Sequence, residues 1–293
     1  MLLSGKARLA GVLGWPVAHS LSPRLHGHWF ARYRIDGVYV PLPVRPEDLE
    51  LAFRALPRLG FLGWNVTIPH KERAFALVDR RDAAAERTGV VNTVLVHPDG
   101  TLEGRNTDGA GFLAHLRAEY PDFVPATALV LGAGGAARAV AFALLEAGCA
   151  QLRLCNRTSA RARALAAGLA RLFPDRVLVC DWPPPPAALS DLALLVNATS
   201  LGMTGQPPLL LDLAPLPAGA IVADLVYVPL ATPLLTAARA RGLRVLDGLG
   251  MLVHQAVPGF AWWGGRVPEV DEELRRCLLE ALEAPARTGL SVH

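Results

Sequence analysis

Lysine is almost absent from this chain: of its 29 basic residues, only Lys6 and Lys71 are not arginine. Cysteine is also scarce, and its copies at positions 149, 155, 180 and 277 form no Cys-x-x-Cys pair. This spacing speaks against a zinc site or a disulfide framework and favours a reducing compartment. No run reaches the roughly 18 apolar residues of a membrane span, and the start of the chain is too weakly apolar for a signal peptide. We therefore expect a cytoplasmic protein without a membrane partner.

Runs of five or more basic residues are missing too, although the formal net charge is +3. Scattered arginine predicts no nucleic-acid partner but suits small anionic ligands. The histidines at positions 19, 26, 28 and 70 lack chelating spacing, so no metal is expected. We expect a small-molecule substrate, and the sequence leaves a monomer and a homodimer equally open. With 52% hydrophobic residues and a length of 293, the chain can form two globular domains.

Strands and helices are expected to alternate along the chain, which predicts an α/β protein. Residues 1–110 form one unit with short strands near residues 9–13, 37–42, 62–68 and 90–96. Residues 111–248 form a second unit, whose alternation predicts a doubly wound parallel sheet with right-handed crossovers. Residues 249–293 are predicted to be helical.

The turn from Gly132 to Ala137 follows an apolar strand and precedes an apolar helix, and it matches G-x-G-x-x-A. Its glycines would allow a tight turn and the approach of a pyrophosphate to the helix N-terminus. About twenty residues later, where an NAD enzyme carries an acidic residue, stand Arg157 and Arg161. A clamp on a 2′-phosphate would explain them, so NADP is expected over NAD. The alternative is that both are solvated in an arginine-rich helix.

Lys71 follows a strand in which Trp64, Val66 and Ile68 are expected to form one buried face. Pro69 suits the first position of the next helix, which places Lys71 in a first turn, where the macrodipole disfavours a cation. A residue that departs from both composition and capping preference is a candidate site residue. The alternative is an ordinary solvated lysine.

Polar side chains also precede two other expected helices. Ser20 and Ser22 come before a helix over residues 24–33, and Asp108 comes before one over residues 110–118. Ser22 and Asp108 could simply be N-caps. Ser20 has no such explanation, and two hydroxyls beside a helix N-terminus would suit a carboxylate.

Together these segments resemble the shikimate dehydrogenases, over nearly the whole chain and in the order of that family. The motifs that carry the resemblance are Gly14-x-Pro16-Val17-x-His19-Ser20-x-Ser22-Pro23, Asn65-Val66-Thr67-x-Pro69-x-Lys71, Val91-Asn92-Thr93, Asn106-Thr107-Asp108-Gly109, Gly132-Ala133-Gly134-Gly135-Ala136, Asn156-Arg157-Thr158, Asn197-Ala198-Thr199-Ser200-x-Gly202-Met203, Asp224-x-Val226-Tyr227-x-Pro229 and Gly250-Met251-Leu252-Val253-x-Gln255.

The resemblance implies reversible NADPH-dependent reduction of 3-dehydroshikimate to shikimate in aromatic amino-acid biosynthesis. It implies a substrate-binding and catalytic domain over residues 1–110, a Rossmann-type NADP domain over residues 111–248, and C-terminal helices over residues 249–293 that return to the first domain. Lys71 and Asp108 would be the catalytic pair. The residues implied to bind substrate are Ser20, Ser22, Asn65, Thr67, Asn92, Tyr227 and Gln255. The residues implied to bind the cofactor are Gly132, Ala133, Gly134, Gly135, Ala136, Asn156, Arg157, Thr158, Arg161, Thr199, Met203, Leu225, Gly248 and Met251.

This reaction gives a reason for the rare lysine. A hydride that reaches a ketone leaves a developing alkoxide, which needs a proton from a positioned acid. An ammonium can supply that proton, whereas arginine does not release one at ordinary pH. Asp108, if close, would keep Lys71 charged and aligned, against the effect of the helix terminus.

Two features depart from the family pattern. Gly27 stands where asparagine is common and is expected to loosen its helix. Pro258-Gly259 predicts a kink or an early end of the helix that carries Gln255, and so puts the packing of the aromatic residues 260–263 in doubt.

Two other functions stay open at this point. One is a quinate or dual quinate/shikimate dehydrogenase of the same superfamily, although Arg157-Thr158 argues against its NAD-using members. The other is a non-catalytic NADP-binding protein, which the presence of Lys71 and Asp108 disfavours.

Overall fold

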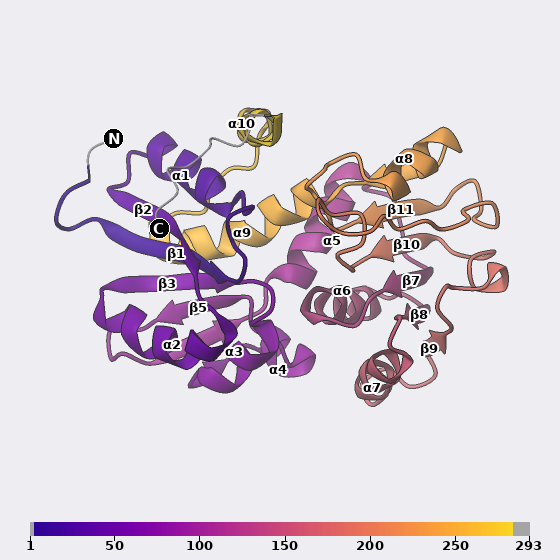
Figure 1. Cartoon of the computed structure of the whole chain (residues 1–293), viewed down its shortest axis with the longest axis horizontal. Coiled ribbons are helices and arrows are strands. Elements are labelled where there is room, and N and C mark those ends of the chain that lie inside the picture. Colours follow the sequence, from indigo (N-terminus) through magenta and orange to yellow (C-terminus); the bar gives the residue numbers. More distant parts are fainter. Residues whose placement is uncertain (1–2, 284–293) are drawn as a thin grey trace.

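The structure is a computed structural model that describes residues 3–283, and these residues form two six-stranded sheets. The strand order is β2-β1-β3-β5-β6-β4 in the first sheet and β12-β11-β10-β7-β8-β9 in the second. Figure 1 shows the two sheets side by side, with the long helix α9 running from one to the other. The α/β fold class with two units is confirmed.

The first sheet is mixed. Strand β1 pairs in parallel with β2 and β3, but β5 is antiparallel to both β3 and β6. The connection from β5 to β6 is only a short turn, and a turn of this length can join only antiparallel neighbours. The elements of this part are β1 (Arg8–Gly14), α1 (Ser22–Arg32), β2 (Gly37–Pro43), η1 (Pro46–Asp48), α2 (Leu49–Arg58), β3 (Phe61–Val66), α3 (Lys71–Leu77), β4 (Arg80–Arg81), α4 (Ala83–Thr88), β5 (Thr93–Val96) and β6 (Leu102–Arg105).

The second sheet is parallel throughout. Along its central strand, Ala128 and Val130 pack into one hydrophobic cluster, and Leu129 and Leu131 pack into another on the opposite face. A strand buried on both faces is what a doubly wound fold requires. The elements here are α5 (Asp108–Glu119), β7 (Thr127–Leu131), α6 (Gly135–Glu146), β8 (Gln151–Cys155), α7 (Ser159–Ala170), β9 (Val177–Cys180), η2 (Pro186–Ala188), β10 (Leu194–Asn197), β11 (Ile221–Asp224), α8 (Pro233–Ala240) and β12 (Arg244–Leu246).

The last two helices, α9 (Gly248–Gly264) and α10 (Glu272–Glu283), return to the first sheet. Phe260 and Trp263 of α9 share a hydrophobic cluster with Trp29 and Phe30 of α1. Near its middle α9 also crosses α5 at close range, since a Cβ added to Gly111 would lie 2.6 Å from the backbone nitrogen of Gln255. One helix thus touches both parts of the molecule.

The prediction that Ile68 belongs to a buried strand face is wrong. Trp64 and Val66 are buried, but Ile68 is 63% exposed. Strand β3 ends at Val66, and the amide of His70 donates to the carbonyl of Thr67 in a turn, so the alternation stops there. Helix α3 consequently begins at Lys71 instead of Pro69.

The early helix end predicted at Pro258 is also wrong, because α9 continues to Gly264. A proline inside a helix costs about 3 kcal/mol, whereas burying a large side chain stabilises by about 1.5–3 kcal/mol. Phe260 and Trp263 are both almost fully buried beyond the proline, so their packing outweighs the lost hydrogen bond. Helix α1 likewise runs unbroken through Gly27.

Candidate active site

Lys71 and Asp108 form a close ion pair between two helix starts. Lys71 is the first residue of α3 and Asp108 the first of α5, and Lys71 Nζ lies 2.6 Å from Asp108 Oδ2. The two side chains are only 15% and 5% exposed. The N-cap of α5 is Thr107, so the alternative reading of Asp108 as the cap is wrong and its carboxylate is available to the lysine.

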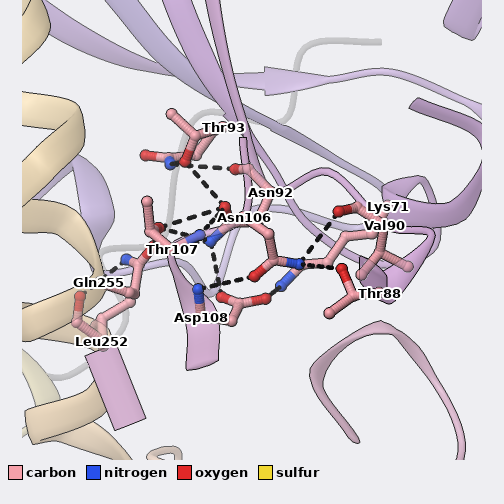
Figure 2. A network of polar contacts seen from close by, with 11 residues as sticks. Lys71, Thr88, Val90, Asn92, Thr93, Asn106, Thr107, Asp108, Leu252 and Gln255 are labelled. Carbon is pink, nitrogen blue, oxygen red and sulfur yellow. Dashed lines mark hydrogen bonds and ion pairs between the residues drawn. The ribbon is translucent and has the colours of Figure 1, made fainter. Parts of the chain in front are cut away.

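Asn92 holds the other side of this carboxylate. Its Nδ2 donates to Asp108 Oδ1 at 2.8 Å, to Thr107 Oγ1 at 2.9 Å and to Gln255 Oε1 at 3.3 Å. Figure 2 shows these side chains converging from the segment just before β5, from the start of α5 and from α9. Both carboxylate oxygens therefore have a donor, one from Lys71 and one from Asn92.

A second layer of buried polar groups holds Asn92. Asn65 Nδ2 donates to Thr93 Oγ1 at 2.9 Å, and Thr93 Oγ1 in turn donates to Asn92 Oδ1 at 3.0 Å. Tyr39 donates its hydroxyl to Asn65 Oδ1 at 2.6 Å. The Asn65 amide is thus occupied by protein groups. A fully satisfied buried network of this kind rigidifies the groups that it contains.

Four residues of this network were not singled out by sequence reasoning: Tyr39, Thr93, Asn106 and Thr107. Asn106 accepts from the amide of Asp108 at 3.0 Å and fixes the start of α5. Three of the four lie inside the motifs quoted above, so their position carried a signal. Tyr39 lies in an ordinary strand pattern and carried none.

Ser20 and Ser22 lie at the start of α1, where Tyr227 of the other part of the chain joins them. The N-cap of α1 is Leu21 and no side chain caps it, so the alternative reading of Ser22 as the cap is wrong. Burial raises the pKa of Tyr227, while hydrogen bonding to the Leu21 backbone and to Ser20 opposes that rise. The Tyr227 hydroxyl, from the other part of the molecule, therefore lies beside Ser20 in front of α1.

The glycine-rich turn lies against Lys71. Gly132 has φ +116°, and a Cβ there would lie 2.9 Å from the carbonyl of Ala198, so only glycine suits this position. A Cβ at Gly134 would meet nothing within 4 Å, which leaves room in front of α6. A Cβ at Gly135 would lie 3.1 Å from Lys71 Cδ. The nucleotide motif and Lys71 are thus direct neighbours.

The two arginines expected to read a 2′-phosphate lie beyond the end of β8 and are exposed. Arg161 Nη2 is 3.9 Å from Glu72 Oε1, and Arg138 Nη2 is 3.9 Å from Glu72 Oε2, which links α7 and α6 to α3. Within residues 3–283 the Arg157 side chain makes no ion pair. The open glycine turn and the unpaired guanidinium of Arg157 fit the anionic groups of NADP.

Asn156 and Thr158 of the expected cofactor set follow β8. Its residues Thr199, Met203, Leu225, Gly248 and Met251 lie after β10 and β11 and at the start of α9. Leu225 donates its amide to the carbonyl of Asn197, and Thr199 Oγ1 donates to Asn197 Oδ1 at 2.7 Å. A Cβ at Gly248 would lie 2.4 Å from the carbonyl of Leu225. They share the carboxyl edge of the second sheet with Gly132. Parallel sheets bind nucleotides at this edge, where the strand order reverses.

Asp224, the last residue of β11, holds the loops at this edge in place through hydrogen bonds. It is fully buried, accepts from Thr232 Oγ1 at 2.7 Å and from Asn197 Nδ2 at 2.9 Å, and burial raises its pKa to about 6. The amide of Val226 also donates to it, at 3.0 Å. This carboxylate fixes the segment that leads to Tyr227.

Among residues 3–283, none of the helices combines the length and the apolar character that a membrane span needs. No group of three or more histidine, cysteine, aspartate or glutamate side chains in that part of the chain is arranged to hold a metal ion.

Known proteins match most of this chain. Residues 12–94 match the family model described as the shikimate dehydrogenase substrate binding domain, and residues 113–183 match the one described as shikimate / quinate 5-dehydrogenase. A protein of Rhodospirillum rubrum named shikimate dehydrogenase (NADP(+)) is 58% identical over 280 residues, which cover 95% of this chain and 99% of that protein.

Solved structures share the fold of this chain over nearly its whole length. A shikimate dehydrogenase in complex with NADP+ superposes with a TM-score of 0.89 at 33% identity, over 96% of this chain and 98% of that one. The quinate dehydrogenase of Corynebacterium glutamicum in complex with NAD superposes with a TM-score of 0.86 at 31% identity, over 95% and 99%.

Proposed function

The chain belongs to the shikimate dehydrogenase family, and we propose that it catalyses the reversible NADPH-dependent reduction of 3-dehydroshikimate to shikimate in aromatic amino-acid biosynthesis. The observation that carries this proposal is the buried pair of Lys71 and Asp108, packed directly against the glycine-rich turn at Gly135. A proton donor beside a nucleotide site is what reduction of a ketone requires.

The chain's own residues handle the proton. Bound NADPH supplies the hydride. Lys71 Nζ holds the proton that the developing alkoxide takes, and it accepts a proton in the reverse direction. Asp108 orients the ammonium through its 2.6 Å contact, while Asn92 fixes the carboxylate from the other side. Because these groups are positioned before the substrate arrives, little reorganisation accompanies the reaction.

We assign substrate recognition to residues 1–110 together with side chains from the other two parts. Ser20, Ser22 and Tyr227 would bind the carboxylate. Thr67, Asn92, Asp108 and Gln255 would bind the ring hydroxyls. Asn65 lies one layer further from Asp108, bonded to Thr93 and Tyr39, and would act through Asn92 as a positioning residue.

We assign NADP binding to residues 111–248 and to the start of α9. Gly132, Ala133, Gly134, Gly135 and Ala136 would hold the pyrophosphate. The adenosine ribose phosphate would lie on Asn156, Arg157, Thr158 and Arg161. The nicotinamide would lie near Thr199, Met203, Leu225, Gly248 and Met251.

A dehydrogenase assay with four arms tests the proposal: shikimate and quinate, each with NADP and with NAD, followed by the absorbance of the reduced cofactor. We expect the highest kcat/KM for shikimate with NADP. A preference for quinate with NAD would favour the other branch of the superfamily. Binding of NADPH without turnover of either substrate would favour a non-catalytic protein.

A further inference from the structure

Two cysteines face one another beside the adenosine end of the proposed cofactor site. Cys155 is the last residue of β8 and Cys180 the last of β9, and the two are register partners in this parallel pair. Neighbouring strands lie about 4.8 Å apart, within the roughly 4.4–6.8 Å between Cα atoms that a disulfide spans. The backbone therefore places both residues at bonding range.

Their side chains point to the same face of the sheet. Both pack against the hydrophobic cluster that includes Leu129, Leu131 and Leu195. Cys155 is buried, and Cys180 is half-buried on the edge strand of the sheet. Of the two residues, Cys180 is therefore the more open to a small oxidant.

The pair is connected to the glycine-rich turn through the backbone. The carbonyl of Cys155 accepts a 2.8 Å hydrogen bond from the amide of Gly132. The next residues along the chain, Asn156 to Thr158, include Arg157 at the proposed phosphate subsite. A shift of Cys155 would therefore displace both the glycine-rich turn and the segment that carries Arg157.

We propose that Cys155 and Cys180 are a redox-sensitive thiol pair, and that their oxidation to a disulfide weakens NADPH binding. The second half of this proposal rests on the proposed function, and the first half does not.

The surroundings make Cys180 the sulfur that reacts first. The neighbouring Cys155 thiol lowers the pKa of Cys180, and the nearby Arg153 guanidinium acts in the same direction against the effect of burial. The Cys155 thiol donates to the carbonyl of Asp181 at 2.8 Å, and its neighbour Cys180 and burial both raise its pKa. Because the thiolate is the nucleophile, attack begins at Cys180.

A peroxide supplies the oxidising equivalents. The Cys180 thiolate attacks one peroxide oxygen, the O–O bond breaks, and a sulfenic acid forms while the other oxygen leaves as water after protonation. The Cys155 sulfur, with loss of its proton, then attacks the sulfenic sulfur, so that an S–S bond forms, the S–O bond breaks and a second water leaves. In total two thiols lose two electrons and two protons, and hydrogen peroxide becomes two waters.

The experiment treats the full chain with hydrogen peroxide or with dithiothreitol and then alkylates free thiols for peptide mass spectrometry. We expect a peptide that links Cys155 to Cys180 only after peroxide, with Cys149 and Cys277 alkylated in both samples. The KM for NADPH should rise by about fivefold in the oxidised enzyme and recover with dithiothreitol. Cys180→Ser should abolish this response, whereas Cys277→Ser should keep it.

Each opposite outcome overturns a separate statement. Oxidation that yields only sulfinic acid or links between two molecules would overturn the thiol pair. A linked peptide with an unchanged KM for NADPH would overturn its effect on the cofactor site. Failure of the proposed function would instead appear as an inactive reduced enzyme, in which the linked peptide could still form.

Discussion

The side chains of Lys71 and Asp108 meet at 2.6 Å although they start two different helices, and the turn at Gly135 covers the lysine stem. Removal of one partner of a buried ion pair leaves an uncompensated charge, which is more costly than loss of an exposed pair. The rare lysine of this chain therefore has a specific place, between the carboxylate that orients it and the turn proposed to bind the cofactor.

Replacement of this lysine tests its role. Lys71→Ala should lower kcat by about 10²–10⁴-fold with little change in the KM for shikimate, because it removes an interaction made chiefly in the transition state. Lys6→Ala is the matched control, since Lys6 is the other lysine and is exposed. Steady-state kinetics of the two variants give the comparison. A large rise in KM with kcat intact would show that Lys71 only binds substrate.

The phosphate subsite can be tested with a single exposed arginine. Arg157→Ala should weaken NADPH by about 1.5–3 kcal/mol, the value of a hydrogen bond to a charged group, and should leave NADH nearly unchanged. Arg163→Ala, an exposed arginine on α7 without a proposed role, is the control. Fluorescence titration with both cofactors measures the effect. Equal losses for NADPH and NADH would contradict the assignment.

Much of the fold could be predicted because its signals are local. The glycine-rich turn, the alternating strands of the second sheet and the order of the motifs are properties of short segments. The pattern does not mark the end of β3, because a residue such as Ile68 continues the apolar alternation while the backbone already turns. The sequence around Pro258 does not show that α9 continues, because the burial of Phe260 depends on α1, far away in the sequence.

Prediction of the site from the sequence is limited in the same way, because local signals do not show contacts between distant segments. The motifs indicate Lys71, Asp108, Asn92 and Gln255. The sequence does not show that the side-chain amide of Asn92 bridges Asp108 and Gln255. Tyr39 stayed unnoticed because nothing in its strand marks it as the partner of Asn65. Contacts between distant segments are set by how the two sheets and α9 pack, and no local pattern encodes them.

We expect the burial of His26 to make the protein less stable in acid. Its ring is fully buried and stacks on Tyr39 with centroids 4.0 Å apart, and within residues 3–283 neither ring nitrogen has a hydrogen-bond partner. The other rings around it belong to Trp29, Phe260 and Trp263. Burial lowers the pKa of His26 to about 3.

The direction of this change in stability follows from the difference in proton binding between the folded and the unfolded chain. Below the ordinary histidine pKa of about 6.5 the unfolded chain takes up a proton that the folded chain refuses, so stability falls as pH falls from 6.5 towards 3. At pH 5 this loss is about 2 kcal/mol. Relative to the native chain, His26→Phe should gain about 2 kcal/mol in unfolding free energy between pH 7.5 and pH 5, as measured by urea unfolding. An equal fall in both proteins would show that other groups cause the acid sensitivity.

Two glycine-to-alanine replacements should change stability in opposite directions. Gly27 is exposed in the middle of α1, and a Cβ there would meet no atom within 4 Å. Gly27→Ala should therefore stabilise the protein by about 0.5–1 kcal/mol, because alanine loses less backbone entropy in a helix. A Cβ at Gly111 in α5 would instead lie 2.6 Å from both the Cβ and the backbone nitrogen of Gln255.

Gly111→Ala should consequently destabilise by about 1–3 kcal/mol, since backbone at a helix crossing cannot move aside as a flexible side chain would. It should also lower activity, because α9 carries Gln255 into contact with Asn92. Chemical unfolding and steady-state kinetics on the two variants separate these effects. If Gly27→Ala proved destabilising, the glycine would serve a local need of α1 that its open surroundings do not reveal. If Gly111→Ala proved neutral, the crossing of α5 and α9 would be looser than the packing around Gln255 indicates.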